Sequence, residues 1–225
     1  MPKYKLDFYY SKEHCTSSCT HPKNADGFHK INVNELLIPT HGDNARAIAY
    51  HEFTHIYDHH YLLQNMSEED KNGILLAYTE YHATMVQMKT ALSFKTEDEN
   101  KNIAIQDIVY DGIKTKSVKD YIEYQTFDVK ETIDDYFNKR DTENMINVVR
   151  HTIYYFAQAD FFLKYCEDKK EILQHMDLHY FTEKFGMDIV TLHLYLQKID
   201  VSKIDDFEKI FYLMCKIGSD YLNKE

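Results

Sequence analysis

Two histidines and one glutamate in a short segment have the spacing of metal ligands with an acid–base group beside them. His51 and His55 are four residues apart in segment 47–57, AIAYHEFTHIY, so on a helix both imidazoles project from one face and can bind a single metal ion. Glu52 is rotated from His51 by about 100° around the helix, which favours a position beside the metal. There its carboxylate can take a proton from water, whose pKa the metal lowers to roughly 7, and return it to a leaving amine.

The surroundings of these three residues indicate a buried helix. Apart from His51, Glu52 and His55, every residue from 47 to 57 is uncharged, whereas a solvent-exposed helix would carry scattered charges. Burying two histidines and a glutamate without partners is costly, so the pattern favours a metal site. The alternative is that neighbouring polar groups satisfy all three side chains within the core.

A third ligand is expected from a later part of the chain. The compact pattern HExxHxxGxxH is not completed, because Asp58 occupies the glycine position and Tyr61 that of the last histidine. The best candidate is Glu80, whose neighbours three and four residues away are small or apolar: Leu76, Ala77, Ala83 and Thr84. A carboxylate on such a stripe faces a closely packed helix and needs a positive partner, either Zn²⁺ or the guanidinium of a core arginine. Two histidines and a glutamate leave the fourth position of one catalytic zinc ion open for water.

The segments that carry these residues are predicted to be two helices that follow a small sheet. Alternating polar and apolar residues predict strands over 4–10 and 28–34, with a short third strand near 36–39. Asp43 or Asn44 can cap a helix that reaches about residue 64, and a second helix is predicted from residue 67 to about 92. Further helices are predicted near residues 117–138, 143–166, 168–184, 188–198 and 204–222.

HExxH followed by a glutamate from the next helix resembles the gluzincin pattern of zinc metallopeptidases. More narrowly, residues 1–95 are similar to the ImmA/IrrE-type metallopeptidases of mobile elements and stress-response systems. Four features carry this narrower resemblance: a Gly-x-x-x-Ile-x-Val-Asn pattern at residues 27–34, Arg46 five residues before His51, His59 four residues after His55, and Ala83 three residues after Glu80. The chain departs from the family at residues 53 and 54, where Phe-Thr replaces the usual Leu-Gly.

The predicted elements give an α+β fold, with a small N-terminal β-sheet plus active-site helices, which the resemblance implies are zincin-like, followed by a mostly α-helical C-terminal half. Residues 1–100 would form the metallopeptidase core and residues 101–225 a helical extension, which can pack with the core as one domain. The implied activity is hydrolysis of a peptide bond in a regulatory protein such as a phage-type repressor. His51, His55 and Glu80 would hold the zinc ion, and Glu52 would be the catalytic residue.

The charge balance argues against nucleic acid as a direct partner. The 225 residues include 26 Lys and Arg against 37 Asp and Glu, a net charge of −11, and an acidic surface repels phosphates. A protein or peptide substrate is therefore expected. The alternative function is that of a non-catalytic acidic inhibitor or interaction protein, which uses a zincin-like scaffold to sequester a partner. The sequence predicts no oligomeric state.

The expected location is cytoplasmic, without membrane association. The first residues lack the apolar stretch of a signal peptide, and no segment approaches the roughly 18 apolar residues that span a bilayer. The four cysteines are accordingly expected to be thiols.

Several polar residues outside the motif can each be interpreted in two ways. The loop containing His14, Cys15, Cys19 and His21, with His29 beyond it, could hold a structural zinc ion or be a polar loop with free thiols. Asp58 could orient His55 through a hydrogen bond or be solvated near the helix end. His59, with His60 beside it, is predicted to lie on the helix surface or, alternatively, to support the ligands. An oxyanion-stabilising group is expected from a later segment, with four candidates: His82, His151, Tyr154 and Tyr155.

Overall fold

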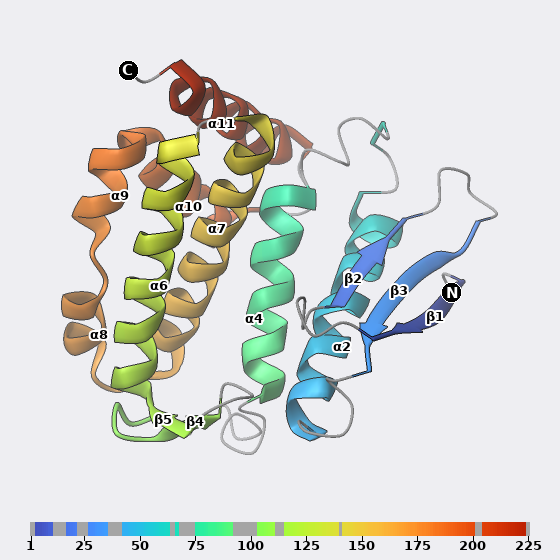
Figure 1. Cartoon of the computed structure of the whole chain (residues 1–225), viewed down its shortest axis with the longest axis horizontal. Helices are drawn as coiled ribbons and strands as arrows, with labels where there is room; N and C mark the ends of the chain where they lie inside the picture. The colour runs from blue at the N-terminus through green and yellow to red at the C-terminus, as the bar shows by residue number, and fades with distance from the viewer. Residues whose placement is uncertain are drawn as a thin grey trace.

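A small three-stranded sheet and a larger set of helices lie on opposite sides of one central helix (Figure 1). The computed structural model describes residues 3–10, 17–21, 27–35, 42–63, 66–67, 75–91, 103–110, 115–139, 141–200 and 204–223. The predicted α+β class, with an N-terminal sheet and a helical C-terminal half, is confirmed. None of the described helices is long and apolar enough to cross a bilayer.

The sheet is built from β1 (Tyr4–Tyr9), β2 (Ser17–Thr20) and β3 (His29–Asn34), in the order β1-β3-β2. β1 pairs with β3 in parallel, and β2 pairs with β3 antiparallel. The two predicted strands are confirmed, but β2 lies in a stretch predicted as a loop. Its residues, SSCT, are turn formers whose strand conformation comes from pairing with β3 and was therefore not visible in the local sequence. The predicted strand at 36–39 lies outside the described residues.

The helices that carry the motif each contain a π-helical turn next to a predicted ligand. α2 (Gly42–Tyr57) continues into η1 (Asp58–Leu62), where the Leu63 amide donates to the Asp58 carbonyl oxygen at 2.9 Å. η2 (Leu75–Thr79) leads directly into α4 (Glu80–Ala91). Such turns widen the helix by one residue and often occur at functional sites.

The C-terminal half consists mostly of helices. After the two-stranded pair β4 (Ile108–Tyr110) and β5 (Thr115–Ser117), the helices are α6 (Val118–Lys139), α7 (Thr142–Tyr165), α8 (Lys169–His175), α9 (Leu178–Phe185), α10 (Met187–Lys198) and α11 (Ile204–Asn223). The helix predicted over 168–184 is two helices, divided at Met176 and Asp177. Gly186 ends α9 with φ of 73°, a left-handed conformation that favours glycine.

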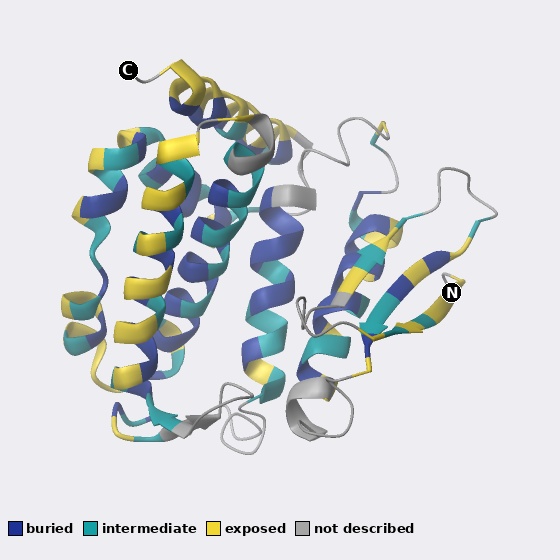
Figure 2. Ribbon diagram, viewed as in Figure 1, coloured by how far each residue is buried: buried dark blue, intermediate teal, exposed yellow. Residues whose placement is uncertain are grey.

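One hydrophobic core joins the two halves through α4 (Figure 2). α4 packs against α2 on one side and against α7 on the other. Tyr78 and Tyr81 from the N-terminal half belong to the same buried cluster as Phe156 and Phe162 of α7. The boundary predicted near residue 100 lies outside the described residues.

Candidate metal centre

The three predicted ligands meet at one buried point between α2 and α4. Nε2 of His51 lies 3.1 Å from Nε2 of His55. Oε2 of Glu80 lies 3.4 Å from the His51 nitrogen and 3.3 Å from the His55 nitrogen. All three residues are less than a tenth exposed. The i, i+4 spacing aligns the two imidazoles, and the first residue of α4 places Glu80 opposite them.

This triangle has the dimensions of one face of a zinc coordination tetrahedron. Nitrogen and oxygen ligands bound to zinc at 2.0–2.1 Å in tetrahedral geometry lie about 3.3 Å from one another. The three observed separations, 3.1, 3.4 and 3.3 Å, therefore fit a metal without rearrangement. Two imidazoles and a carboxylate are also a donor set that zinc accepts in catalytic sites.

Each imidazole has a different environment at its second nitrogen. Nδ1 of His55 is 3.0 Å from the buried Thr79 hydroxyl, which fixes the ring with Nε2 towards the centre. Nδ1 of His51 is buried and has no hydrogen-bond partner among the described residues. Asp58 does not hydrogen-bond to His55 and is not solvated: it is fully buried, and its carboxylate is 3.0 Å from Nδ1 of His82. Asp58 begins η1, a π-helical turn that the sequence did not predict.

Glu80 contacts α7 as well as the two imidazoles. The Tyr154 hydroxyl donates to Oε2 of Glu80 at 2.9 Å, and Nε of Arg150 lies 3.4 Å from Oε1 in an ion pair without hydrogen-bond geometry. The two partners that the sequence offered for Glu80, a metal and a core arginine, are thus compatible, because each faces a different oxygen. Burial alone would raise the pKa of Glu80, but hydrogen bonds and charges from His51 and His55 hold it well below its usual range.

Glu52 belongs to the same electrostatic environment. It is 5% exposed on α2. Burial opposes protonation of His55, yet Glu80, with smaller contributions from Glu52 and Asp58, raises the pKa of that imidazole. Burial raises the pKa of the Cys19 thiol on β2 to about 12, with a further contribution from Glu52. The charge of Glu52 therefore acts both on His55 of its own helix and on Cys19 of the sheet.

Of the four candidates for stabilising an oxyanion, Tyr154 is the one that contacts a ligand. Its ring centre lies 6.0 Å from that of His51, and burial, followed by the Glu80 charge, raises its pKa well above the usual value. His82 pairs with Asp58, and Tyr155 bonds to Thr126 in the core. His151 packs edge-on against the Tyr154 ring. The sequence could not choose Tyr154 because the choice depends on how α7 packs on α4.

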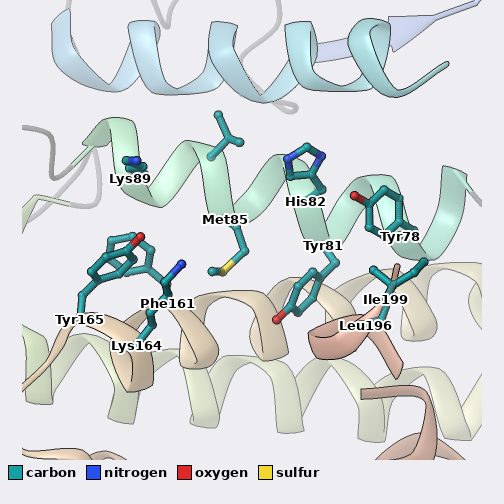
Figure 3. Close-up of a pocket in the computed structure, with 11 residues that line it drawn as sticks. Tyr78, Tyr81, His82, Met85, Lys89, Phe161, Lys164, Tyr165, Leu196 and Ile199 are labelled. Carbon is teal, nitrogen blue, oxygen red and sulfur yellow. The ribbon is translucent and has the colours of Figure 1, made fainter. Parts of the chain in front are cut away.

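A separate cavity of about 350 Å³ lies between α4 and α7 (Figure 3). Tyr81 and Met85 point into it from α4, and Phe161, Lys164 and Tyr165 line it from α7. None of the three candidate ligands lines this cavity. The cavity and the candidate metal centre therefore use different residues of α7: Phe161, Lys164 and Tyr165 line the cavity, whereas Arg150 and Tyr154 contact Glu80.

Comparisons with protein-family models, curated proteins and solved structures found no match for this chain.

Proposed function

We propose that the protein is a zinc metallopeptidase that hydrolyses a peptide bond in a protein substrate. The observation that carries this proposal is the buried triangle of His51, His55 and Glu80, whose three separations fit tetrahedral coordination. A zinc ion held by these three residues would supply a Lewis acid, which would polarise a carbonyl and lower the pKa of water to about 7.

Glu52 is the proposed acid–base residue. It is buried on the same helix as the two histidines, and its charge contributes to raising the pKa of His55. In that position its carboxylate accepts a proton from the attacking water and then delivers this proton to the leaving amine. Glu80 is unsuited to this task, because its two oxygens are occupied by the imidazoles, Tyr154 and Arg150.

Tyr154 is the proposed oxyanion-stabilising residue. Burial keeps its hydroxyl protonated near neutral pH, so it remains a hydrogen-bond donor. In the structure it donates to Oε2 of Glu80, and we propose that it donates to the developing oxyanion during the reaction. Arg150 is a positioning residue, because it holds the other oxygen of Glu80.

The substrate class follows from the motif resemblance. We propose an ImmA/IrrE-type enzyme of the gluzincin kind, which acts in the cytoplasm on a regulatory protein such as a repressor. The supporting features are the HExxHxxxH segment, Arg46 and the E-x-x-A arrangement at Glu80 and Ala83. The helical half is then available to recognise the substrate.

The decisive variant is Glu52→Gln, which removes the base while keeping the size of the side chain. We expect this variant to fold and to keep its zinc, but to cleave no member of a peptide library. Mass spectrometry of the library would detect the cleavage products of the wild type. Tyr57→Phe is the matched control, because Tyr57 lies on the same helix and is half exposed. Cleavage retained by Glu52→Gln would contradict the mechanism.

The second candidate function is a non-catalytic interaction protein on this scaffold. The observation that favours it is the Arg150–Glu80 ion pair, which supplies a positive partner for Glu80 without a metal. Metal analysis of the purified protein separates the two candidates. A zinc ion that is lost in Glu80→Ala supports the peptidase, whereas a zinc content that Glu80→Ala leaves unchanged supports the interaction protein.

A further inference from the structure

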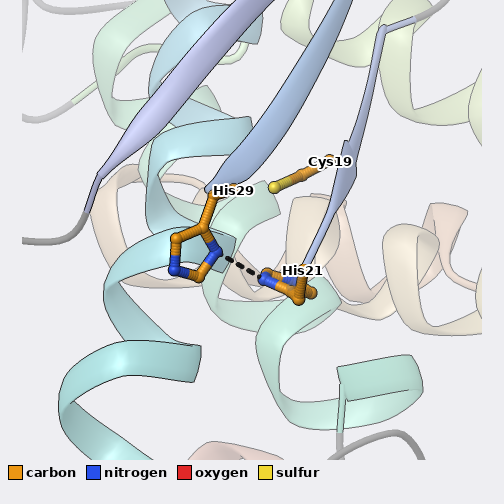
Figure 4. A group of neighbouring side chains, drawn as sticks. All are labelled: Cys19, His21 and His29. Carbon is orange, nitrogen blue, oxygen red and sulfur yellow. Dashed lines mark hydrogen bonds between the residues drawn. The ribbon is translucent and has the colours of Figure 1, made fainter. Parts of the chain in front are cut away.

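A second group of metal-binding side chains lies on the sheet, outside the centre described above. It consists of Cys19 on β2, His21 just beyond β2, and His29 at the start of β3. One potential ligand atom from each residue lies within 4.8 Å of the other two. Figure 4 shows the thiol and both imidazoles directed towards a common point between the two strands.

The strand register explains why these three residues meet. Cys19 pairs with Ile31 and Thr20 with Lys30, and continuing this antiparallel register places His21 opposite His29. Side chains of directly opposed residues lie on the same face of a sheet. Residues two apart along a strand also share a face, so Cys19 is on the side of His21. The juxtaposition is thus built into the pairing of β2 with β3.

The contacts within the group are those of ligands that face one another. Nδ1 of His21 lies 2.9 Å from Nδ1 of His29, which is 4% exposed. The Cys19 thiol donates a weak hydrogen bond to the Thr20 carbonyl oxygen, with the sulfur and oxygen 4.0 Å apart. One thiolate and two imidazoles form a ligand set that strongly favours zinc.

His59 holds the two histidine rings in place from the helix side. Its ring stacks flat on His21, with centroids 4.2 Å apart and planes 2° apart, and meets His29 edge-on at 5.4 Å. The prediction that His59 lies on the helix surface is wrong, since it is 9% exposed. Because His59 belongs to η1, one turn after His55, this stack connects the group to the helix of the first centre.

We propose that Cys19, His21 and His29 bind a second zinc ion, which fixes β2 to β3 and, through His59, to the helix that carries His51 and His55. This ion has a positioning role, and the three described ligands leave one coordination position. His14 and Cys15, which the sequence also offered as ligands, lie outside the described residues. The proposal does not depend on peptidase activity, because it concerns the sheet and its attachment to α2 and η1.

Zinc analysis of the purified full-length chain tests the proposal. After equilibration with excess zinc and removal of the unbound metal, we expect two equivalents in the wild type and one in Cys19→Ser. Cys215→Ser is the matched control, because Cys215 is exposed on α11. This variant should still bind two equivalents of zinc. His51→Ala should also bind one equivalent, and the zinc ion that remains in this variant should be the one held by Cys19, His21 and His29.

Cobalt substitution provides a readout that does not depend on counting ions. The cobalt-loaded wild type should show thiolate-to-cobalt charge-transfer absorption in the near ultraviolet, and Cys19→Ser should lose it while His51→Ala keeps it. His29→Gln keeps the thiol and should weaken the band at limiting cobalt, which covers the case in which Cys19→Ser fails to fold. An unchanged zinc content and an unchanged band in Cys19→Ser would overturn the second site and leave the first one intact.

Discussion

The two oxygens of Glu80 have different partners, and this division determines what the residue can do. Oε2 faces the two imidazoles and the Tyr154 hydroxyl, whereas Oε1 faces Arg150. A carboxylate that bridges a metal and an arginine is oriented more firmly than one held by the metal alone. We therefore expect Arg150 to orient Glu80. The Tyr154 hydroxyl is the contact that we expect to shift from Glu80 to a substrate oxygen.

Replacing Tyr154 by Phe tests this assignment at the level of one atom. We expect zinc content and KM to stay close to wild type, while kcat falls about 10²- to 10³-fold, the usual loss when one oxyanion donor is removed. Steady-state kinetics on a peptide cleaved by the wild type would measure both parameters.

The neighbouring Tyr155→Phe is the control, because its hydroxyl bonds to Thr126 in the core of the helical half. It should lower stability slightly and leave kcat unchanged. Equal losses of kcat in the two variants would argue against a role for Tyr154 in the reaction.

The residues of the first centre could be predicted because helical periodicity is local. The spacing of His51 and His55, and the small neighbours of Glu80, are properties of single helices. The roles of Arg150, Tyr154 and His59 are not local: each depends on contact with an element that is distant in the sequence. The sequence offered Cys19, His21 and His29, together with His14 and Cys15, as possible zinc ligands, and the pairing of β2 with β3 is what brings Cys19, His21 and His29 together.

At the scale of elements, the helix predicted over 168–184 is divided in two, and a short polar side chain begins the second of the two helices. Asp177 accepts a hydrogen bond from the Tyr180 amide at 3.2 Å and so caps α9. The same carboxylate is 2.7 Å from Nζ of Lys130 on α6. Apolar periodicity continues across the break, which explains why a single helix was predicted over 168–184.

Two substitutions at Asp177 separate the cap from the ion pair. Asp177→Ala removes both and should lower the free energy of unfolding by about 1 kcal/mol for the cap, with a smaller loss for the partly exposed pair. Asp177→Asn keeps a cap acceptor and loses only the charge. Urea unfolding followed by far-ultraviolet circular dichroism would measure both.

The effect of pH on these variants has a defined sign. The hydrogen bond from Lys130 holds the pKa of Asp177 below its usual value of 3.8. A lowered pKa in the folded state stabilises the protein above the unfolded-state pKa, and this contribution is lost as pH falls through the folded-state pKa. The wild type should therefore exceed Asp177→Asn in stability at pH 6, and the difference should shrink below about pH 4. A difference that grows on acidification would contradict the ion pair.

At the scale of the whole molecule, α4 joins the sheet side to the helical side. The Tyr81 hydroxyl donates to Oδ2 of Asp160 at 2.6 Å, and the same oxygen lies 2.7 Å from Nε2 of His193 on α10. Gln197 donates to the other oxygen of Asp160 at 2.6 Å. Buried networks of this kind fix relative positions, so we expect the two halves to unfold together.

Labelling of Cys166 under native conditions tests this cooperativity. Cys166 is 1% exposed at the end of α7, far along the chain from the metal ligands. If the chain opens as one unit, zinc at 100 times the dissociation constant of the first centre should slow labelling of this thiol by about 100-fold in Cys19→Ser, which keeps that centre alone. Peptide mass spectrometry would follow the reaction. The exposed Cys215 is the internal control, and a Cys166 rate that ignores zinc would mean that the helical half opens independently.

Because α4 packs against the helical half, that half can affect the distances among the three candidate metal ligands. Successive residues of this helix face the ligand triangle at Glu80, the Asp160 network at Tyr81 and the buried Asp58 at His82, so the helix cannot slide to suit one of them alone. Metal–ligand distances in protein sites lie within about 0.2 Å of their usual values. We therefore expect substitutions at Asp160 or His193, which contact none of the three candidate ligands, to shorten the time for which a zinc ion stays bound, because both residues hold α4 in place.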